Sequence, residues 1–334
     1  MNNFKFKLID YTVMIVVAFV FTLFVMALFS CSSEGDELEV ANGFPQPLTF
    51  EATVDDVTVD DATVTRASTS AKDKWGVGDL VAVTVGGGSP LQYKIATAAQ
   101  SSTMSGNGTS NTFWWTADGQ TKEVRAWFYG DGTYRNACTG AWTLPATQTE
   151  ANIQGYDFLY ASNTLTYSTG STYALDFYHQ LAKVTVNIKY ANDASSANNA
   201  LTAITLTASI YPTGTFAMPA VSKASAVTKY GTWTASGTTS SVTPGKLASA
   251  NSGYTYTYSA LLIPQTFAGN SKLVLTMTFN TLGELTYDTG LTKPEAGKHY
   301  IYNITVNKEN IKVLQSTFGD WSTGGTDTTV YYKN

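Results

Sequence analysis

The chain has 334 residues, of which 13% are charged, and its formal net charge at pH 7 is -5. This length allows about two domains of roughly 150 residues, and domains of that size bury enough surface to fold without disulfides. An acidic chain with no cluster of basic residues argues against nucleic acid as a partner. Few charges together with abundant Gly, Ser, Thr and Tyr favour an extracellular all-β protein over a cytosolic helical one.

The first thirty residues have the features of a lipoprotein signal peptide. A short basic region is followed by an uncharged apolar stretch over residues 11–29, and Ser30 then precedes Cys31 at the position of the lipid-accepting cysteine. We therefore predict a signal peptide over residues 1–30 and lipid attachment at Cys31. An uncleaved membrane anchor is the alternative, because the apolar stretch is just long enough to span a bilayer.

Residues 31–45 are polar and acidic and are predicted to be a solvated tether, since they contain too few apolar residues to fold alone. Three acyl chains on Cys31, at about 0.8 kcal/mol per buried CH₂, would hold the protein in a membrane permanently. Under either interpretation of the N-terminus, the remainder of the chain lies outside the cytoplasm. We expect it at the surface of an outer membrane.

From residue 46 onward, apolar and polar residues alternate with period two, which predicts strands separated by turns. Leu48, Phe50, Ala52 and Val54 alternate with polar residues, so this segment is predicted to be a half-buried strand. The other predicted strands are Leu80–Val85, Gln92–Ala96, Val124–Tyr129, Leu181–Tyr190, Leu201–Ile210, Tyr254–Leu262, Lys272–Phe279 and Tyr300–Val306. Turns are predicted at Gly86–Gly88, Gly130–Gly132, Asn192–Asp193, Pro212–Gly214 and Asn270.

No segment has a convincing amphipathic helical pattern, and Ala191–Ala200 is predicted to be a loop or one short helical turn. The density of short strands predicts an all-β fold with two β-sandwich domains. A polar, glycine-containing stretch at residues 167–172 is a plausible boundary. We therefore expect an N-terminal domain over residues 46–170 and a C-terminal domain over residues 171–334.

The cysteine and histidine residues, which in other proteins act in catalysis or metal binding, are expected to have structural roles here. With Cys31 lipidated, Cys138 has no disulfide partner and is predicted to be a buried, inert thiol. His179 and His299 occur without an HExxH motif or a cluster of Asp, Glu and Cys, so no metal site is predicted and both are expected to be hydrogen-bonded structural residues. Phosphate-binding loops and a GxSxG nucleophile motif are absent from the sequence. The chain is therefore predicted to have no catalytic residues and no cofactor.

Two aromatic triplets, residues 113–115 and 127–129, could form a platform for sugars. In a strand, however, Trp127 and Tyr129 share one face and Phe128 lies on the other, so at least one face must belong to a core. Core packing is therefore the favoured interpretation of these aromatic residues.

Five stretches occur in a characteristic order: VTRA at 64–67, WGVGDLVAV at 75–83, DFYHQLAKVTV at 176–186, AGKHYIYNITV at 296–306 and FGDW at 318–321. Together with the lipoprotein-like N-terminus, this ordered set resembles the fimbrillin family, the subunits of protease-matured pili of anaerobic gut and oral bacteria. The resemblance extends over nearly the whole chain after the signal peptide.

The resemblance implies two transthyretin-like β-sandwich domains in a lipidated precursor. It also implies that a protease cuts after an arginine near the first domain, here between Arg66 and Ala67. Residues 48–64 would then be the strand region that leaves, and a terminal strand of a sister subunit would fill the groove. In this chain, residues 326–334 are predicted to be that donor strand or else the last edge strand. The expected partners are sister pilins, the outer membrane and a surface ligand on a host or bacterium.

Two other functions remain open at this stage. A non-polymerising surface lipoprotein could capture glycans or host proteins, and would retain residues 32–66. A hydrolase of extracellular polysaccharide would need a pair of carboxylates in a cleft, which the sequence alone does not reveal.

Overall fold

The computed structural model describes residues 43–55, 74–192, 194–221, 229–308, 311–320 and 327–331. The chain divides into two compact units, Met1–Gln46 and Pro47–Asn334, and the second contains nearly all of the described residues. The predicted apolar stretch, Cys31, the tether up to residue 42, Arg66 and Ala67 all lie outside the described residues. Among the helices in the described ranges, none has the length and apolar character needed to cross a membrane.

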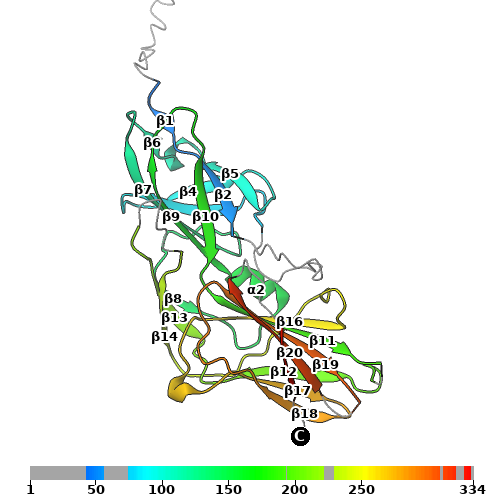
Figure 1. Ribbon diagram of the computed structural model, residues 1–334. Coiled ribbons are helices and arrows are strands. Elements are labelled where there is room, and N and C mark those ends of the chain that lie inside the picture. Colours follow the sequence, from blue (N-terminus) through cyan, green and yellow to red (C-terminus); the bar gives the residue numbers. More distant parts are fainter. Residues whose placement is uncertain are drawn as a thin grey trace, which may run out of the picture. The chain divides into compact units, whose positions relative to one another are not determined.

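Seven strands of the second unit close into a barrel, in the order β10-β2-β5-β4-β3-β7-β9 (Figure 1). The barrel strands are β2 (Phe50–Val54), β3 (Leu80–Val85), β4 (Leu91–Ile95), β5 (Ser101–Gly106), β7 (Thr121–Tyr129), β9 (Phe158–Thr166) and β10 (Tyr173–His179). Two further strands have two residues each, β1 (Gln46–Pro47) and β6 (Trp114–Trp115). The barrel therefore takes its last strand, β10, from beyond residue 170.

The barrel core is built around Trp75, which lies in the loop before β3 and is 1% exposed. Its indole ring meets Phe128 of β7 and Phe177 of β10 edge-on, with ring centroids 5.1 and 5.0 Å apart. Edge-to-face contacts of this kind add to the stabilisation that burial alone provides. The first residue of the predicted WGVGD stretch is thus a central core residue.

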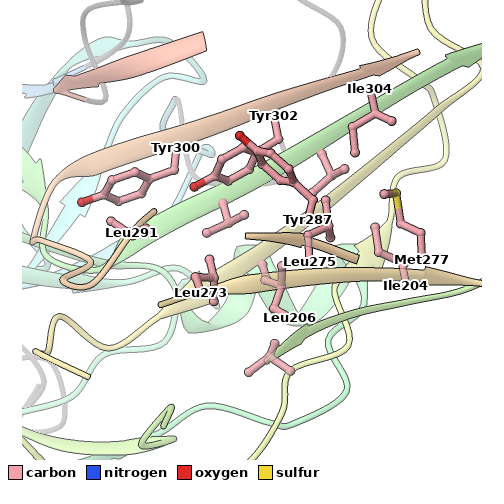
Figure 2. Packing of buried hydrophobic residues seen from close by; sticks show 14 of the residues in the cluster. Ile204, Leu206, Leu273, Leu275, Met277, Tyr287, Leu291, Tyr300, Tyr302 and Ile304 are labelled. Carbon is pink, nitrogen blue, oxygen red and sulfur yellow. The ribbon is translucent and has the colours of Figure 1, made fainter. Parts of the chain in front are cut away.

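The C-terminal part contains two layered sheets, one with the strand order β15-β16-β11-β19-β20-β21 and one with the order β12-β17-β18. The first sheet comprises β11 (Ala182–Tyr190), β15 (Gly245–Lys246), β16 (Tyr256–Leu262), β19 (Lys298–Val306), β20 (Ile311–Asp320) and β21 (Asp327–Tyr331). The second comprises β12 (Leu201–Thr207), β17 (Val274–Phe279) and β18 (Gly283–Asp288). Apolar side chains from both sheets interdigitate between the layers, among them Leu206, Leu275, Met277, Tyr302 and Ile304 (Figure 2).

β11 is the central strand of the larger sheet and pairs antiparallel with β16 and parallel with β19. Its first seven residues are all buried. Val184, Val186 and Ile188 of β11 belong to the core between the layers. On the other face, Lys183, Thr185 and Asn187 are buried polar residues, and the Thr185 hydroxyl lies 3.0 Å from that of Ser259.

A third sheet, of three strands, includes a segment that was predicted to be a turn. It has the order β14-β13-β8, with β8 (Ala141–Thr143), β13 (Thr213–Ala217) and β14 (Thr232–Ser236). The prediction of a turn at Pro212–Gly214 was wrong, because β13 begins at Thr213. Gly214 lies inside this strand, where a Cβ atom would be 2.7 Å from Cγ2 of Ile263. This glycine serves a close approach rather than a turn.

The sequence showed no convincing amphipathic helical pattern, yet a short helix, α2 (Glu150–Tyr156), precedes β9. The hydroxyl of Thr149 caps this helix by accepting a hydrogen bond from the Asn152 N–H at 3.2 Å. Ile153 is its one buried residue. The helix was not predicted because a segment of seven residues with a single buried position shows no helical repeat of apolar residues.

Gly130 should be far less tolerant of substitution than Gly155, the residue that follows Gln154 in α2. A Cβ on Gly130 would be 1.8 Å from the Gln154 carbonyl oxygen, whereas a Cβ on Gly155 would be 3.8 Å from its nearest neighbour. We expect Gly130→Ala to destabilise the protein by about 1–3 kcal/mol through overpacking. Gly155→Ala lies within α2 and should stabilise it by about 0.5–1 kcal/mol. Urea unfolding of both variants tests this, and equal midpoints would contradict the packing at Gly130.

Candidate functional site

The candidate site is the slot in the barrel that holds residues 48–54. The side chains of Leu48, Phe50, Ala52 and Val54 are all at most 1% exposed, whereas Glu51 on the opposite face is exposed. The predicted alternation is therefore confirmed. If this strand left the barrel, four apolar pockets would open to water.

Both edges of β2 are paired. It runs parallel to β10, with Ala52 opposite Leu175, and antiparallel to β5, with Ala52 opposite Ser102 (Figure 1). Its removal would leave β5 and β10 each with an unpaired row of backbone N–H and C=O groups. A slot with two open edges and apolar pockets is suited to receive another extended strand.

Side chains from other segments also hold backbone carbonyls of residues 48–54. The indole Nε1 of Trp75 donates to the Ala52 carbonyl at 2.8 Å, and the hydroxyl of Tyr93 donates to the Leu48 carbonyl at 3.1 Å. A third, longer hydrogen bond of 3.3 Å runs from Nε2 of Gln100 to the Val54 carbonyl. These contacts involve only the main chain of the strand, so they do not depend on its side chains.

Tyr93 is fixed on both sides of its hydroxyl. It accepts a hydrogen bond of 3.0 Å from the Phe113 N–H while donating to Leu48. Burial raises the pKa of Tyr93 to about 12, so the phenol keeps its proton at physiological pH. The Leu48 N–H in turn donates to the Phe113 carbonyl at 2.8 Å.

The C-terminal strand predicted as a donor or edge strand is β21. It pairs antiparallel with β20, and it is the last strand of its sheet in the described residues. In this monomer, β21 occupies the edge position. An edge strand has one paired side only and is the easiest strand of a sheet to detach.

The aromatic residues of β7 are buried on both faces, which confirms the core interpretation for residues 127–129. In the other triplet Trp115 is buried, whereas Phe113 and Trp114 are half-buried. Phe128 packs inside the barrel, while Trp127 and Tyr129 are 4% and 7% exposed on its outer face. The Tyr129 ring stacks on Trp142 with centroids 4.7 Å apart. The guanidinium of Arg135 lies 4.5 Å from the centre of the same tyrosine ring. These faces are covered by protein and are not an open sugar platform.

Cys138 is a free, buried cysteine beside this aromatic cluster, as predicted. Burial raises the pKa of its thiol to about 12, although the charge of Arg125 acts in the opposite direction. The thiolate needed for nucleophilic chemistry is therefore strongly disfavoured.

Both histidines make hydrogen bonds or ion pairs, and His179 is buried whereas His299 is half-buried. Nδ1 of His179 lies 2.9 Å from Oδ2 of Asp157, and both side chains are at most 3% exposed. Nε2 of His299 lies 2.8 Å from the Thr185 hydroxyl. In the part of the chain that the structure describes, no group of three or more His, Cys, Asp or Glu could hold a metal ion.

His299 makes the stability of the fold sensitive to acid. Burial, reinforced by the charges of Lys183 and His179, lowers the pKa of His299 well below 6.5. Below pH 6.5 the unfolded chain binds a proton at this position that the folded chain does not, so this contribution to stability is lost as the pH falls. The loss is at most about 1.4 kcal/mol per pH unit.

Comparing wild type with His299→Asn isolates this contribution. Asparagine can retain a hydrogen bond to Thr185 but does not titrate. Between pH 6.5 and 5, the stability advantage of the wild type over the variant should shrink. Parallel stability curves from urea unfolding over that interval would contradict the assignment.

The fold defines a mostly β protein with several sheets, and comparison with known proteins gives its family. The fimbrillin-like family matches residues 65–321, which is more than half of the chain. The chain therefore belongs to the fimbrillin-like family, a non-enzymatic class of fimbrial and adhesive surface proteins. No curated protein matches the chain.

Two solved structures share this fold over most of the chain. A candidate cell adhesion protein from Bacteroides uniformis is 18% identical, with a TM-score of 0.58, and the match covers 83% of this chain and 98% of that one. A candidate cell adhesion protein from Bacteroides ovatus is 22% identical, with the same TM-score and coverage. The tip fimbrial protein Mfa3 of Porphyromonas gingivalis, truncated at its C-terminus, is 12% identical over 82% of this chain and all of that one, with a TM-score of 0.44.

Proposed function

We propose that this protein is a lipid-anchored surface subunit that assembles into or onto a pilus by exchange of strands between sister molecules and serves cell adhesion. Cys31 carries the lipid after removal of residues 1–30, and residues 31–45 tether the protein to the outer membrane. Membership of the fimbrillin-like family supports the pilus as the destination.

The observation that carries this proposal is the slot of β2. A strand with a fully apolar inner face, paired on both edges, leaves behind a groove that only another strand can fill well. The described part of the strand ends at Asp55, before the proposed processing bond between Arg66 and Ala67. Cleavage there would separate the strand covalently from the rest of the barrel.

The proposed donor is the C-terminal segment 326–334, which contains β21. Its edge position supports this role because it can leave its own sheet without opening the centre. We also propose two domains of the transthyretin-like kind. The pairing of β10 with β2 and β9 supports a boundary between His179 and Ala182 rather than near residue 170.

Arg66→Ala tests the proposed processing step. In cells that make the native pilus, this variant should accumulate as an uncleaved, lipidated monomer, because the peptide bond to Ala67 would no longer follow an arginine. Arg135→Ala is the control, since it removes another exposed arginine and should not affect cleavage. Mass spectrometry of the native protein shows whether its N-terminus is Cys31 or Ala67. Polymers of the Arg66→Ala protein with residues 32–66 still attached would refute the proposal.

One observation favours a second function, a non-polymerising adhesive lipoprotein. In the monomer, β2 is bonded along both edges and β21 already has a partner in its own sheet, so the molecule is complete by itself. Retention of residues 32–66 in a native monomer would support this alternative.

A further inference from the structure

We propose that the slot of β2 fixes the register of whichever strand occupies it, through two side-chain donors that reach backbone carbonyls and one position that accepts only a small side chain. The donors are Trp75 and Tyr93, and the small position is that of Ala52. The inference rests on the proposed function in one respect: the occupant other than β2 would be a strand from a second copy of this chain.

The two donors exclude a shift by one residue. Trp75 and Tyr93 are both buried, and their partners, the carbonyls of Ala52 and Leu48, lie four positions apart. Successive carbonyls of a strand point to opposite edges. A shift by one residue would therefore turn both carbonyls away and expose the apolar side chains, leaving two buried donors without acceptors.

A shift by two residues again places backbone carbonyls opposite Trp75 and Tyr93, so these two donors cannot exclude it. The size of the side chain at the position of Ala52 does exclude it. Such a shift places a residue like Phe50 or Val54 where Ala52 now lies, with Leu175 and Ser102 on the neighbouring strands. The indole that binds the Ala52 carbonyl is fully buried and packed against two phenylalanine rings. Close-packed interiors do not accommodate added methylene groups without strain.

Together, these features define the strand that the slot accepts. Three inward positions take large or branched apolar residues, as at Leu48, Phe50 and Val54, and the position between the last two takes a small residue. The outward residues Thr49 and Glu51 are exposed and Thr53 is half-buried, so these positions impose a weaker demand on side-chain size than the inward ones. The carbonyl contacts impose no further demand on sequence, because every residue supplies a carbonyl.

The test measures strand exchange in the full-length protein after it is cut at a protease site inserted between Asp55 and Trp75. A fluorescent peptide with the sequence of residues 46–55 should replace the cut strand. A peptide carrying Ala52→Leu should bind at least about tenfold more weakly, and one carrying Ala52→Ser should bind within about threefold of the parent. Equal binding of the leucine and parent peptides would overturn the proposal.

Trp75→Phe keeps an aromatic ring and removes the donor. In this variant the parent peptide should dissociate about tenfold faster, as expected for loss of one buried hydrogen bond. Trp233→Phe is the matched control, because Nε1 of Trp233 also donates to a carbonyl, that of Gln180, at 2.7 Å. The parent peptide should dissociate from the Trp233→Phe protein at the same rate as from the unsubstituted protein. An unchanged rate in Trp75→Phe would contradict the role of the indole.

A second measurement applies if the cut protein does not exchange its strand. In the uncut chain, Trp75→Phe should speed hydrogen exchange of the β2 amides about tenfold relative to those of β12, and Trp233→Phe should not. A uniform change across both strands would overturn the proposal. These experiments need no polymer, so their outcome is independent of whether Arg66→Ala blocks assembly as the proposed function predicts.

Discussion

Replacing Trp75 with alanine is expected to lower the free energy of unfolding by about 3–5 kcal/mol, the usual range for truncating a fully buried aromatic side chain. The side chain is 1% exposed, touches Phe128 and Phe177 with its ring, and holds the backbone of β2 through Ala52. Its loss would leave a cavity at the centre of the barrel and an acceptor without its partner. Urea unfolding followed by tryptophan fluorescence and circular dichroism measures the effect.

Val77→Ala is the control for this prediction. Val77 lies two residues further along the same loop and is 70% exposed, so its truncation should change stability by less than about 0.5 kcal/mol. If Trp75→Ala were as mild as Val77→Ala, the central place of the indole in the barrel would be wrong.

Deleting residues 326–334 is expected to abolish polymerisation and to leave a folded monomer. Among the described strands, β21 pairs with β20 alone. Its loss therefore removes one edge strand of the sheet and leaves the layered core of β11, β12, β17 and β19 intact. Electron microscopy of assembled material and circular dichroism of the monomer give the two readouts.

A shorter deletion, residues 332–334, is the control and keeps β21 complete. It should polymerise more readily than the longer deletion. Normal polymers from the longer deletion would show that the C-terminal strand is not the donor.

The strands were predictable where apolar and polar residues alternate or where β-branched residues form a run. The alternation at residues 48–54 and the β-branched run of β3 both gave strands at the expected positions. Their partners were not predictable, because pairing depends on residues distant in sequence, such as Ala52 with Leu175. β5 escaped prediction because its sequence, SSTMSG, has a single large apolar residue, Met104.

The aromatic segment of β7 shows why one buried face was easier to predict than two. Alternation placed Phe128 opposite to Trp127 and Tyr129, and this is correct. The outer face is buried because Trp142 and Phe216, from distant segments, cover it. No local pattern in the sequence carries that information.

The candidate site was predicted in part. The apolar face of its strand followed from periodicity. Cys31 followed from the signal-peptide pattern, and Arg66 and Ala67 came from a family resemblance; all three stay predictions. Trp75 was noticed as part of a motif, but its hydrogen bond to a carbonyl depends on how the loop before β3 enters the barrel. Nothing in the sequence distinguishes Tyr93 from the other tyrosines of the chain.

The most direct test of strand exchange is to join β2 covalently to its neighbour. Glu51 and Thr103 lie opposite each other on β2 and β5, and both are exposed. Val54 donates its N–H to Gln100 across the same two strands, so the alternating ladder makes Glu51 and Thr103 a non-hydrogen-bonded pair, in which side chains are close. Glu51→Cys with Thr103→Cys should therefore form a disulfide. Cys138 is buried and should not interfere.

The measurement is polymer formation by this double variant with and without a reductant. We predict polymers under reducing conditions and only monomers when the disulfide is formed, because a strand that cannot leave keeps the slot closed. Single variants at each position should polymerise under both conditions. Polymers of normal length from fully oxidised double variant would contradict the account, since β2 would then have remained in its slot throughout assembly.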